Sequence, residues 1–231
     1  MSQIADNLTL LEERIANASS KAGRNAQDIK LIAVSKTVDA ERIKQAIEAG
    51  VTILGENYIQ EARNKIKEIG QGARWDFIGH LQSNKANYAV DLFEMIHSVD
   101  RLSLAQGLNR VAEKKGKKVR ILVQVNISGE ETKSGINPQK VKALIVEIAS
   151  MNNLLLEGLM TMPPYFDDPE NARPYFTALR EVRDSILQER IGDFSLQELS
   201  MGMSGDFEVA IEEGSTMVRI GTAIFGGRPP Q

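Results

Sequence analysis

The chain of 231 residues alternates short apolar, β-branched runs with longer amphipathic segments along most of its length. Apolar runs of this size between turn residues predict buried strands, whereas apolar positions three and four residues apart predict helices. We expect strands at residues 31–35, 51–54, 75–78, 95–99, 119–127, 154–160, 197–200 and 217–220. Strands that alternate with helices favour a parallel sheet, because parallel neighbours need a long crossover between them.

Local start signals place several of the helices. An amphipathic helix is expected before the first strand, with apolar side chains at Ile4, Leu8, Leu11 and Ile15. Asp39 and Asp206 are expected to cap helices by accepting backbone N–H bonds, and Asn137-Pro138 predicts another helix start. The helix after the third strand is expected near residues 84–91.

Eight strand–helix repeats in this length predict an α/β fold, namely a single (β/α)8 TIM barrel with an extra N-terminal helix. The alternative is an open doubly wound sheet, which would need fewer strands or a reversal of strand order. No linker, low-complexity stretch or charge block divides the sequence. We therefore expect one domain over residues 1–231.

Composition excludes several classes of function. The formal net charge of -3 does not favour nucleic acid or an anionic membrane, and no apolar run is long enough to span a bilayer. The chain has no cysteine, so disulfides and thiol catalysis are excluded. Its two histidines lack ligand spacing, so no metal site is expected. The first residues do not resemble a signal peptide, and we expect a cytoplasmic location.

Lys36 follows the first predicted strand directly, which places an amine at the mouth of an apolar segment. A lysine in apolar surroundings loses basicity and becomes a nucleophile toward aldehydes. Three interpretations remain open at this point. Lys36 could bind an anion, form a Schiff base, or extend its amine to water.

The segments after the seventh and eighth strands combine glycine with hydroxyl side chains, among them Ser200, Ser204, Gly221 and Thr222. TIM barrels often bind phosphate at these two loops, because glycine lets backbone N–H groups approach closely. The alternative is that these residues only form turns. Arg219 lies inside the apolar eighth strand, where it either forms a structural ion pair or donates hydrogen bonds into the barrel mouth.

Six segments together resemble the pyridoxal phosphate homeostasis proteins. They are AVSKT (33–37), GENY (55–58), FIGHLQSNK (77–85), GLMTM (158–162), LSMGMS (199–204) and VRIGTAIFG (218–226). The resemblance covers nearly the whole chain. It implies a barrel like the N-terminal domain of alanine racemase, which is a type III pyridoxal phosphate fold.

The resemblance also implies roles for individual residues. Lys36 would form the internal aldimine with pyridoxal 5′-phosphate, Arg219 would face the pyridine nitrogen, and Asn57 would lie beside the ring. The phosphate would be bound by Ser200, Ser204, Gly221 and Thr222. A permanent cation at Arg219 would disfavour protonation of the ring nitrogen and so weaken the cofactor as an electron sink.

Two functions from different classes fit these expectations, and we favour a non-catalytic carrier or regulator that binds pyridoxal phosphate and influences amino-acid and keto-acid pools. Such a protein would be a monomer that contacts pyridoxal phosphate-dependent apoenzymes transiently. The alternative is an amino-acid racemase of the alanine racemase type. The sequence ends at Gln231, soon after the eighth strand, so we expect none of the additional β domain of that enzyme. A sugar-phosphate aldolase or isomerase is a third possibility.

Overall fold

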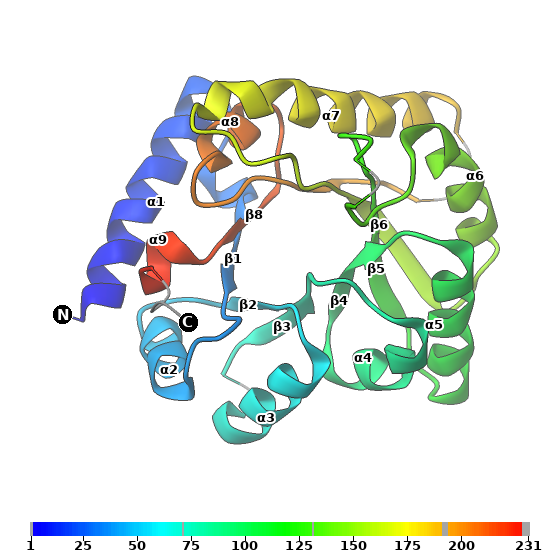
Figure 1. The fold of residues 1–231 in the computed structure, drawn as a ribbon, viewed down its shortest axis with the longest axis horizontal. Helices are drawn as coiled ribbons and strands as arrows, with labels where there is room; N and C mark the ends of the chain where they lie inside the picture. Colours follow the sequence, from blue (N-terminus) through cyan, green and yellow to red (C-terminus); the bar gives the residue numbers. More distant parts are fainter. Residues whose placement is uncertain (1, 71, 131, 191–193, 228–231) are drawn as a thin grey trace.

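The computed structural model describes residues 2–70, 72–130, 132–190 and 194–227. Within these ranges, eight parallel strands close into a barrel in sequence order, and helices surround it (Figure 1). The strands are β1 (Lys30–Val34), β2 (Ile53–Glu56), β3 (Arg74–Phe77), β4 (Met95–Val99), β5 (Val119–Gln124), β6 (Leu154–Met160), β7 (Glu198–Ser200) and β8 (Met217–Ile220). The predicted TIM barrel is confirmed, and the open doubly wound sheet is excluded because β1 pairs with β8.

The helices follow the strands in the expected order. They are α1 (Gln3–Lys21), α2 (Ala40–Glu48), α3 (Ile59–Ile69), α4 (Ala86–Leu92), α5 (Leu102–Lys114), α6 (Pro138–Ala149), α7 (Arg173–Gln188), α8 (Phe207–Glu212) and α9 (Thr222–Phe225). Short 3-10 turns precede β1, α4 and α7. None of the helices within the described ranges combines the length and apolar character that a bilayer crossing requires.

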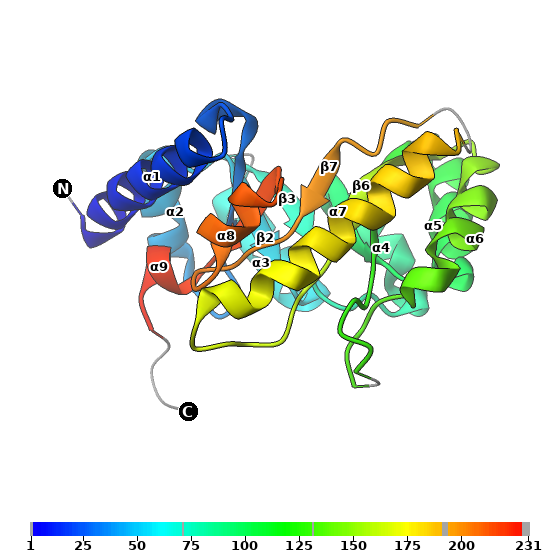
Figure 2. The ribbon, with the colours of Figure 1, turned by 90° about the horizontal axis from the view of Figure 1, so that it is seen from above.

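The predicted N-terminal helix is α1, which lies outside the barrel against α8 and α9 (Figure 2). Its apolar face buries Ile4, Leu8, Leu11 and Ile15. Asn7 donates a side-chain hydrogen bond of 2.9 Å to the carbonyl of Ile224 in α9. The helix therefore supports the segment that follows the last strand.

The described part of the chain contains two apolar clusters that stabilise the barrel. The larger one lies mainly between the strands and the surrounding helices. A smaller cluster contains strand residues alone, as expected for the barrel interior, and consists of Ile32, Ile53, Met95, Leu122, Met160 and Met217. Polar side chains are also buried on the barrel strands, among them Asp76, His97, Ser200 and Arg219.

Local signals located most boundaries, with a few corrections. Asp39 and Asn137 cap α2 and α6 as predicted. The fifth strand is shorter than predicted and ends at Gln124, because the Asn126 side chain accepts from the Gly129 N–H and begins a turn. The helix predicted at residues 84–91 begins two residues later, after a 3-10 turn.

The predicted cap at Asp206 is wrong. Asp206 precedes α8, but its side chain makes no capping bond to the helix. Its carboxylate instead accepts the backbone N–H of Met203 at 2.6 Å. This bond closes the loop after β7 and keeps the carboxylate at the mouth of the barrel.

Candidate functional site

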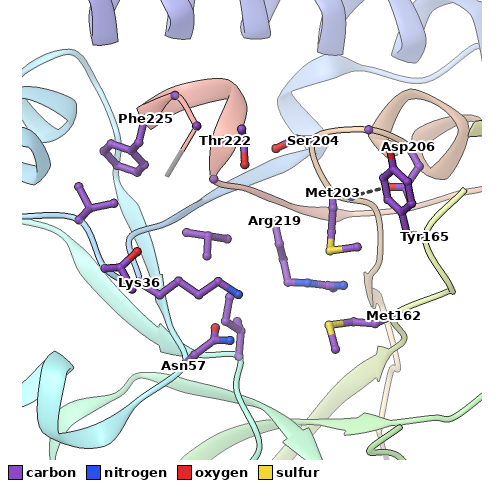
Figure 3. A pocket seen from close by; sticks show the side chains of 18 of the residues that line it. Lys36, Asn57, Met162, Tyr165, Met203, Ser204, Asp206, Arg219, Thr222 and Phe225 are labelled. Atoms are coloured by element: carbon purple, nitrogen blue, oxygen red, sulfur yellow. Dashed lines mark hydrogen bonds between the residues drawn. The ribbon is translucent and has the colours of Figure 1, made fainter. Parts of the chain in front are cut away.

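A cavity of about 340 Å³ lies at the carboxyl ends of the strands (Figure 3). Segments that follow β1, β2, β6, β7 and β8 form its wall, so residues distant in sequence meet there. Six predicted site residues line it, namely Lys36, Asn57, Ser204, Arg219, Gly221 and Thr222. The barrel thus brings together an amine, a guanidinium and two hydroxyl groups.

Lys36 lies two residues beyond the end of β1, and its side chain extends into the cavity (Figure 3). The next residue, Thr37, has a φ of 63°, in the left-handed region that residues other than glycine seldom adopt. The N–H of Thr37 donates to Glu61 Oε1 at 2.5 Å. Side chains from α3 therefore hold the turn that carries Lys36.

A buried ionic cluster extends this support beneath Lys36. The ammonium of Lys65 donates to Glu56 Oε1 at 2.8 Å and to Glu61 Oε1 at 2.6 Å. Glu56 is fully buried and also accepts the Ser35 hydroxyl at 2.7 Å. Burial raises the pKa of Glu56, although hydrogen bonds from Lys65 and Ser35 oppose that rise.

Arg219 is 3% exposed, on β8, and its guanidinium reaches the cavity. It donates to the Ser200 hydroxyl at 2.7 Å and to the carbonyl of Thr161 at 2.8 Å. Burial lowers the pKa of Arg219 to about 10, and Asp206 acts in the opposite direction. Arg219 therefore stays charged near neutral pH, and two of its five N–H groups are used by the barrel.

The loops after β7 and β8 lie side by side at one end of the cavity, with the Ser204 and Thr222 hydroxyls close to each other (Figure 3). Ser204 accepts the backbone N–H of Ala223 at 3.4 Å, which joins the two loops. A Cβ on Gly221 would lie 3.4 Å from Val34, so this residue packs tightly on β1. These groups form a donor-rich corner suited to an anion.

Two further polar side chains in the wall of the cavity, Asn57 and Asp206, could interact with a ligand. The buried Oδ1 of Asn57 has no hydrogen-bond partner within the described ranges, so its amide is available to a bound group. Asp206 places a carboxyl near the donor-rich corner. Burial raises the pKa of Asp206, and the Met203 N–H and Arg219 oppose that rise.

Ser200 differs from the other predicted residues because it does not line the cavity. It is fully buried at the end of β7, and its hydroxyl contacts Arg219 and His97. His97 in turn contacts Asp76. His97 and Asp76 were not among the site residues expected from the sequence, although both interrupt apolar strands, which is the signal that could have indicated them.

An apolar wall on the side of the cavity away from Lys36 was not expected from the sequence either. It contains Met162, Tyr165 and Met203 (Figure 3), and Phe166 also lines the cavity. These residues lie in the loops after the sixth and seventh strands, where the barrel geometry alone could have indicated a lining role.

Comparison with known proteins identifies the family. The model of the alanine racemase N-terminal domain matches residues 7–229. A pyridoxal phosphate homeostasis protein from Aquifex aeolicus (strain VF5) is 44% identical over 224 residues, which cover 96% of this chain and 97% of the relative. The chain belongs to the pyridoxal phosphate homeostasis protein family. The resemblance inferred from the six sequence segments is therefore confirmed.

Solved structures agree with this family. PipY of Synechococcus elongatus PCC7942, solved with PLP bound, is 33% identical to the chain with a TM-score of 0.84, covering 97% of this chain and 100% of PipY. An alanine racemase from Clostridium difficile 630 is 19% identical with a TM-score of 0.73, covering 98% of this chain but 58% of the racemase. The second likeness shows the shared barrel fold alone.

Proposed function

We propose that the chain binds pyridoxal 5′-phosphate through Lys36 and acts in the homeostasis of this cofactor, without dedicated catalysis. The observation that carries the proposal is the meeting of Lys36 and Arg219 in one cavity beside two loops rich in hydroxyl groups and glycine. An amine, a cation and a donor-rich corner match the aldehyde, ring and phosphate of this molecule.

The donor set fits each part of the cofactor. Ser204, Gly221 and Thr222 would hold the phosphate, because hydroxyl and close backbone N–H groups bind phosphate oxygens. Asn57, with its unpartnered Oδ1, would lie beside the ring. The apolar wall at Met162 and Met203 would face the ring edge. When bound, the cofactor supplies an aldehyde that condenses with an amine and a ring that can accept electron density.

The chain's own residues restrict what this chemistry can do. Lys36 Nζ would be the point of attachment, held by the turn that Glu61 and Lys65 stabilise. Arg219 would donate an N–H to the ring nitrogen. Because a guanidinium keeps its protons near neutral pH, Arg219 would disfavour protonation of the ring nitrogen. An unprotonated ring accepts carbanion charge poorly, which suits retention of the cofactor better than broad catalysis.

The comparisons support the same function. The Aquifex relative is named a pyridoxal phosphate homeostasis protein, and PipY is described with PLP bound. We extend both properties to this chain as part of the proposal. We also propose that residues 1–231 act as one cofactor-binding domain in the cytoplasm, that the chain is a monomer, and that it contacts apoenzymes transiently.

The racemase alternative requires a second acid–base group opposite Lys36. Tyr165 lines the cavity on that side, but 84% of its surface is exposed (Figure 3). A side chain so exposed is not held at a fixed distance from a substrate carbon. Turnover of amino acids by the loaded chain at about 1 per second or faster would favour a racemase instead.

The central test is the visible absorption of the purified chain after addition of pyridoxal 5′-phosphate. We expect a band in the wild type that disappears in Lys36→Ala and persists in Lys44→Ala, which changes an exposed lysine on α2. Borohydride reduction followed by mass spectrometry should place the adduct on Lys36. A wild-type chain that cannot be loaded would refute the proposal.

A further inference from the structure

A row of buried hydrogen bonds crosses the barrel interior from Arg219 to β3. The guanidinium NH1 of Arg219 lies 2.7 Å from Ser200 Oγ, and Ser200 Oγ lies 3.0 Å from His97 Nδ1. His97 Nε2 lies 3.2 Å from Asp76 Oδ2. Arg74 closes the row by donating to both oxygens of Asp76 at 2.8 and 2.7 Å.

The chemistry of these groups fixes the direction of every bond. Arginine only donates, so Ser200 Oγ accepts from Arg219. The ionised Asp76 carboxylate only accepts, so His97 Nε2 carries a proton and donates it to Asp76. A neutral ring then has no proton on Nδ1, which accepts the hydroxyl proton of Ser200. The bonds therefore run one way, from a cation at the cavity to a carboxylate on β3.

The charges around His97 agree with a neutral ring. The ionised groups facing it are Asp76 and Arg74 on β3 and Arg219 on β8. Burial lowers the pKa of His97, Asp76 opposes this, and the two arginines lower the pKa further. For Asp76, burial alone would raise the pKa, but hydrogen bonds from His97 and Arg74 bring it below its usual range.

We propose that Ser200 and His97 are positioning residues that orient Arg219 toward the ligand, with Asp76 fixing the tautomer of His97. Ser200 and the Thr161 carbonyl hold one edge of the guanidinium, which leaves other N–H groups of Arg219 for the cavity. The identification of this ligand as pyridoxal 5′-phosphate rests on the proposed function. The hydrogen-bond row itself does not, because it is a property of the ligand-free chain.

The first experiment uses the ligand-free chain. The sequence contains two histidines, so ¹⁵N NMR of the imidazole rings resolves few signals, and a His80→Gln variant assigns His97 by elimination. We expect His97 to stay neutral with its proton on Nε2 between about pH 5 and 8. A proton on Nδ1, or an imidazolium within that range, would overturn the proposal whether or not the chain binds pyridoxal phosphate.

The second experiment compares two buried serines. Ser200→Ala removes the acceptor of Arg219, whereas Ser98→Ala removes a buried hydroxyl that has no hydrogen-bond partner within the described ranges. We expect Ser200→Ala to raise the dissociation constant of pyridoxal 5′-phosphate about tenfold and to shift its visible band, because a bond to a charged group is lost. Ser98→Ala should change neither. Equal effects from both variants would contradict a positioning role.

A double-variant cycle tests whether His97 acts through Ser200. His97→Leu should weaken binding in the wild-type background and add little in the Ser200→Ala background, because residues in one network are not additive. If the losses of binding free energy from His97→Leu and Ser200→Ala are fully additive, the row of hydrogen bonds from Arg219 to Asp76 is contradicted. Failure of the wild-type chain to bind pyridoxal phosphate would refute the proposed function, and the NMR result would then decide the hydrogen-bond row alone.

Discussion

The ammonium nitrogen of Lys65 lies 2.6 Å from the carbonyl oxygen of Ser35, the residue directly before Lys36. The same ammonium contacts Glu61, which accepts the N–H of Thr37 on the other side of Lys36. Lys65 therefore braces the backbone on both sides of the proposed attachment point. This brace explains how Thr37 can remain in a left-handed conformation.

We expect Lys65→Met to destabilise the chain by about 3–5 kcal/mol, because it leaves the buried carboxylate of Glu56 without its charge partner. Urea unfolding measures the change. The double variant with Glu56→Gln should recover part of the loss, and Lys44→Met, in an exposed ion pair, should have little effect. A wild-type unfolding curve for Lys65→Met would show that the brace carries no stability.

We expect Arg219→Lys to weaken pyridoxal 5′-phosphate binding despite keeping the charge. Arg219 bonds Ser200 and Thr161 through separate nitrogens of a planar fork, and an ammonium cannot reproduce that geometry. Titration of the visible band should show a dissociation constant raised by about tenfold or more. An unchanged constant and spectrum would remove Arg219 from the ligand site.

Gly158 on β6 should not tolerate a side chain. A Cβ at this position would lie 1.8 Å from the backbone carbonyl oxygen of Glu198 on β7, so the strands would have to separate. We expect Gly158→Ala to lower the free energy of unfolding by at least about 1–3 kcal/mol.

Gly107 on α5 provides the matched control, because a Cβ there would meet no atom of the described residues within 4 Å. Gly107→Ala should stabilise the chain by about 0.5–1 kcal/mol through the better helix propensity of alanine. Similar unfolding curves for the two variants would contradict the close approach of β6 and β7.

The raised pKa of Asp206 predicts a pH dependence of stability. The folded chain binds this proton more tightly than the unfolded chain, so the associated stability is present at low pH and is lost as pH rises through the raised pKa. Asp206→Asn keeps an acceptor for the Met203 N–H and removes the charge. Above the raised pKa, the free energy of unfolding of the variant should exceed that of the wild type. This difference should shrink as the pH falls toward 3.8, which urea unfolding at several pH values would measure.

Several parts of this protein could be predicted because their signals are local. Strand and helix positions follow from the spacing of apolar residues, and the caps at Asp39 and Asn137 follow from side chains that bond the next turn. The position of Lys36 at the mouth follows in the same way, because parallel strands in a barrel all end on one side. The four-residue helix α9 was missed because its glycine-rich flanks look like a loop.

The role of Ser200 shows where local signals fail. Ser200 and Ser204 have the same side chain in neighbouring positions, yet Ser204 lines the cavity and Ser200 lies buried against Arg219 and His97. The difference arises from the strand, which ends at Ser200 and directs that side chain into the barrel. The predicted cap at Asp206 is absent for a related reason. The Asp206 carboxylate accepts the backbone N–H of Met203 in the preceding loop, and makes no capping bond to α8.

The sequence by itself determined the alternation of strands and helices, which favours a barrel, and the residue types at the strand ends, because hydrophobic periodicity and turn chemistry act over a few residues. Closure of the sheet by pairing of β1 with β8 appeared only in the tertiary structure. The tertiary structure alone decided which polar side chains meet. The row from Arg219 to Asp76 and the brace of Lys65 across Ser35 join residues on different elements. Such contacts depend on strand register and on which face each side chain takes after the barrel closes.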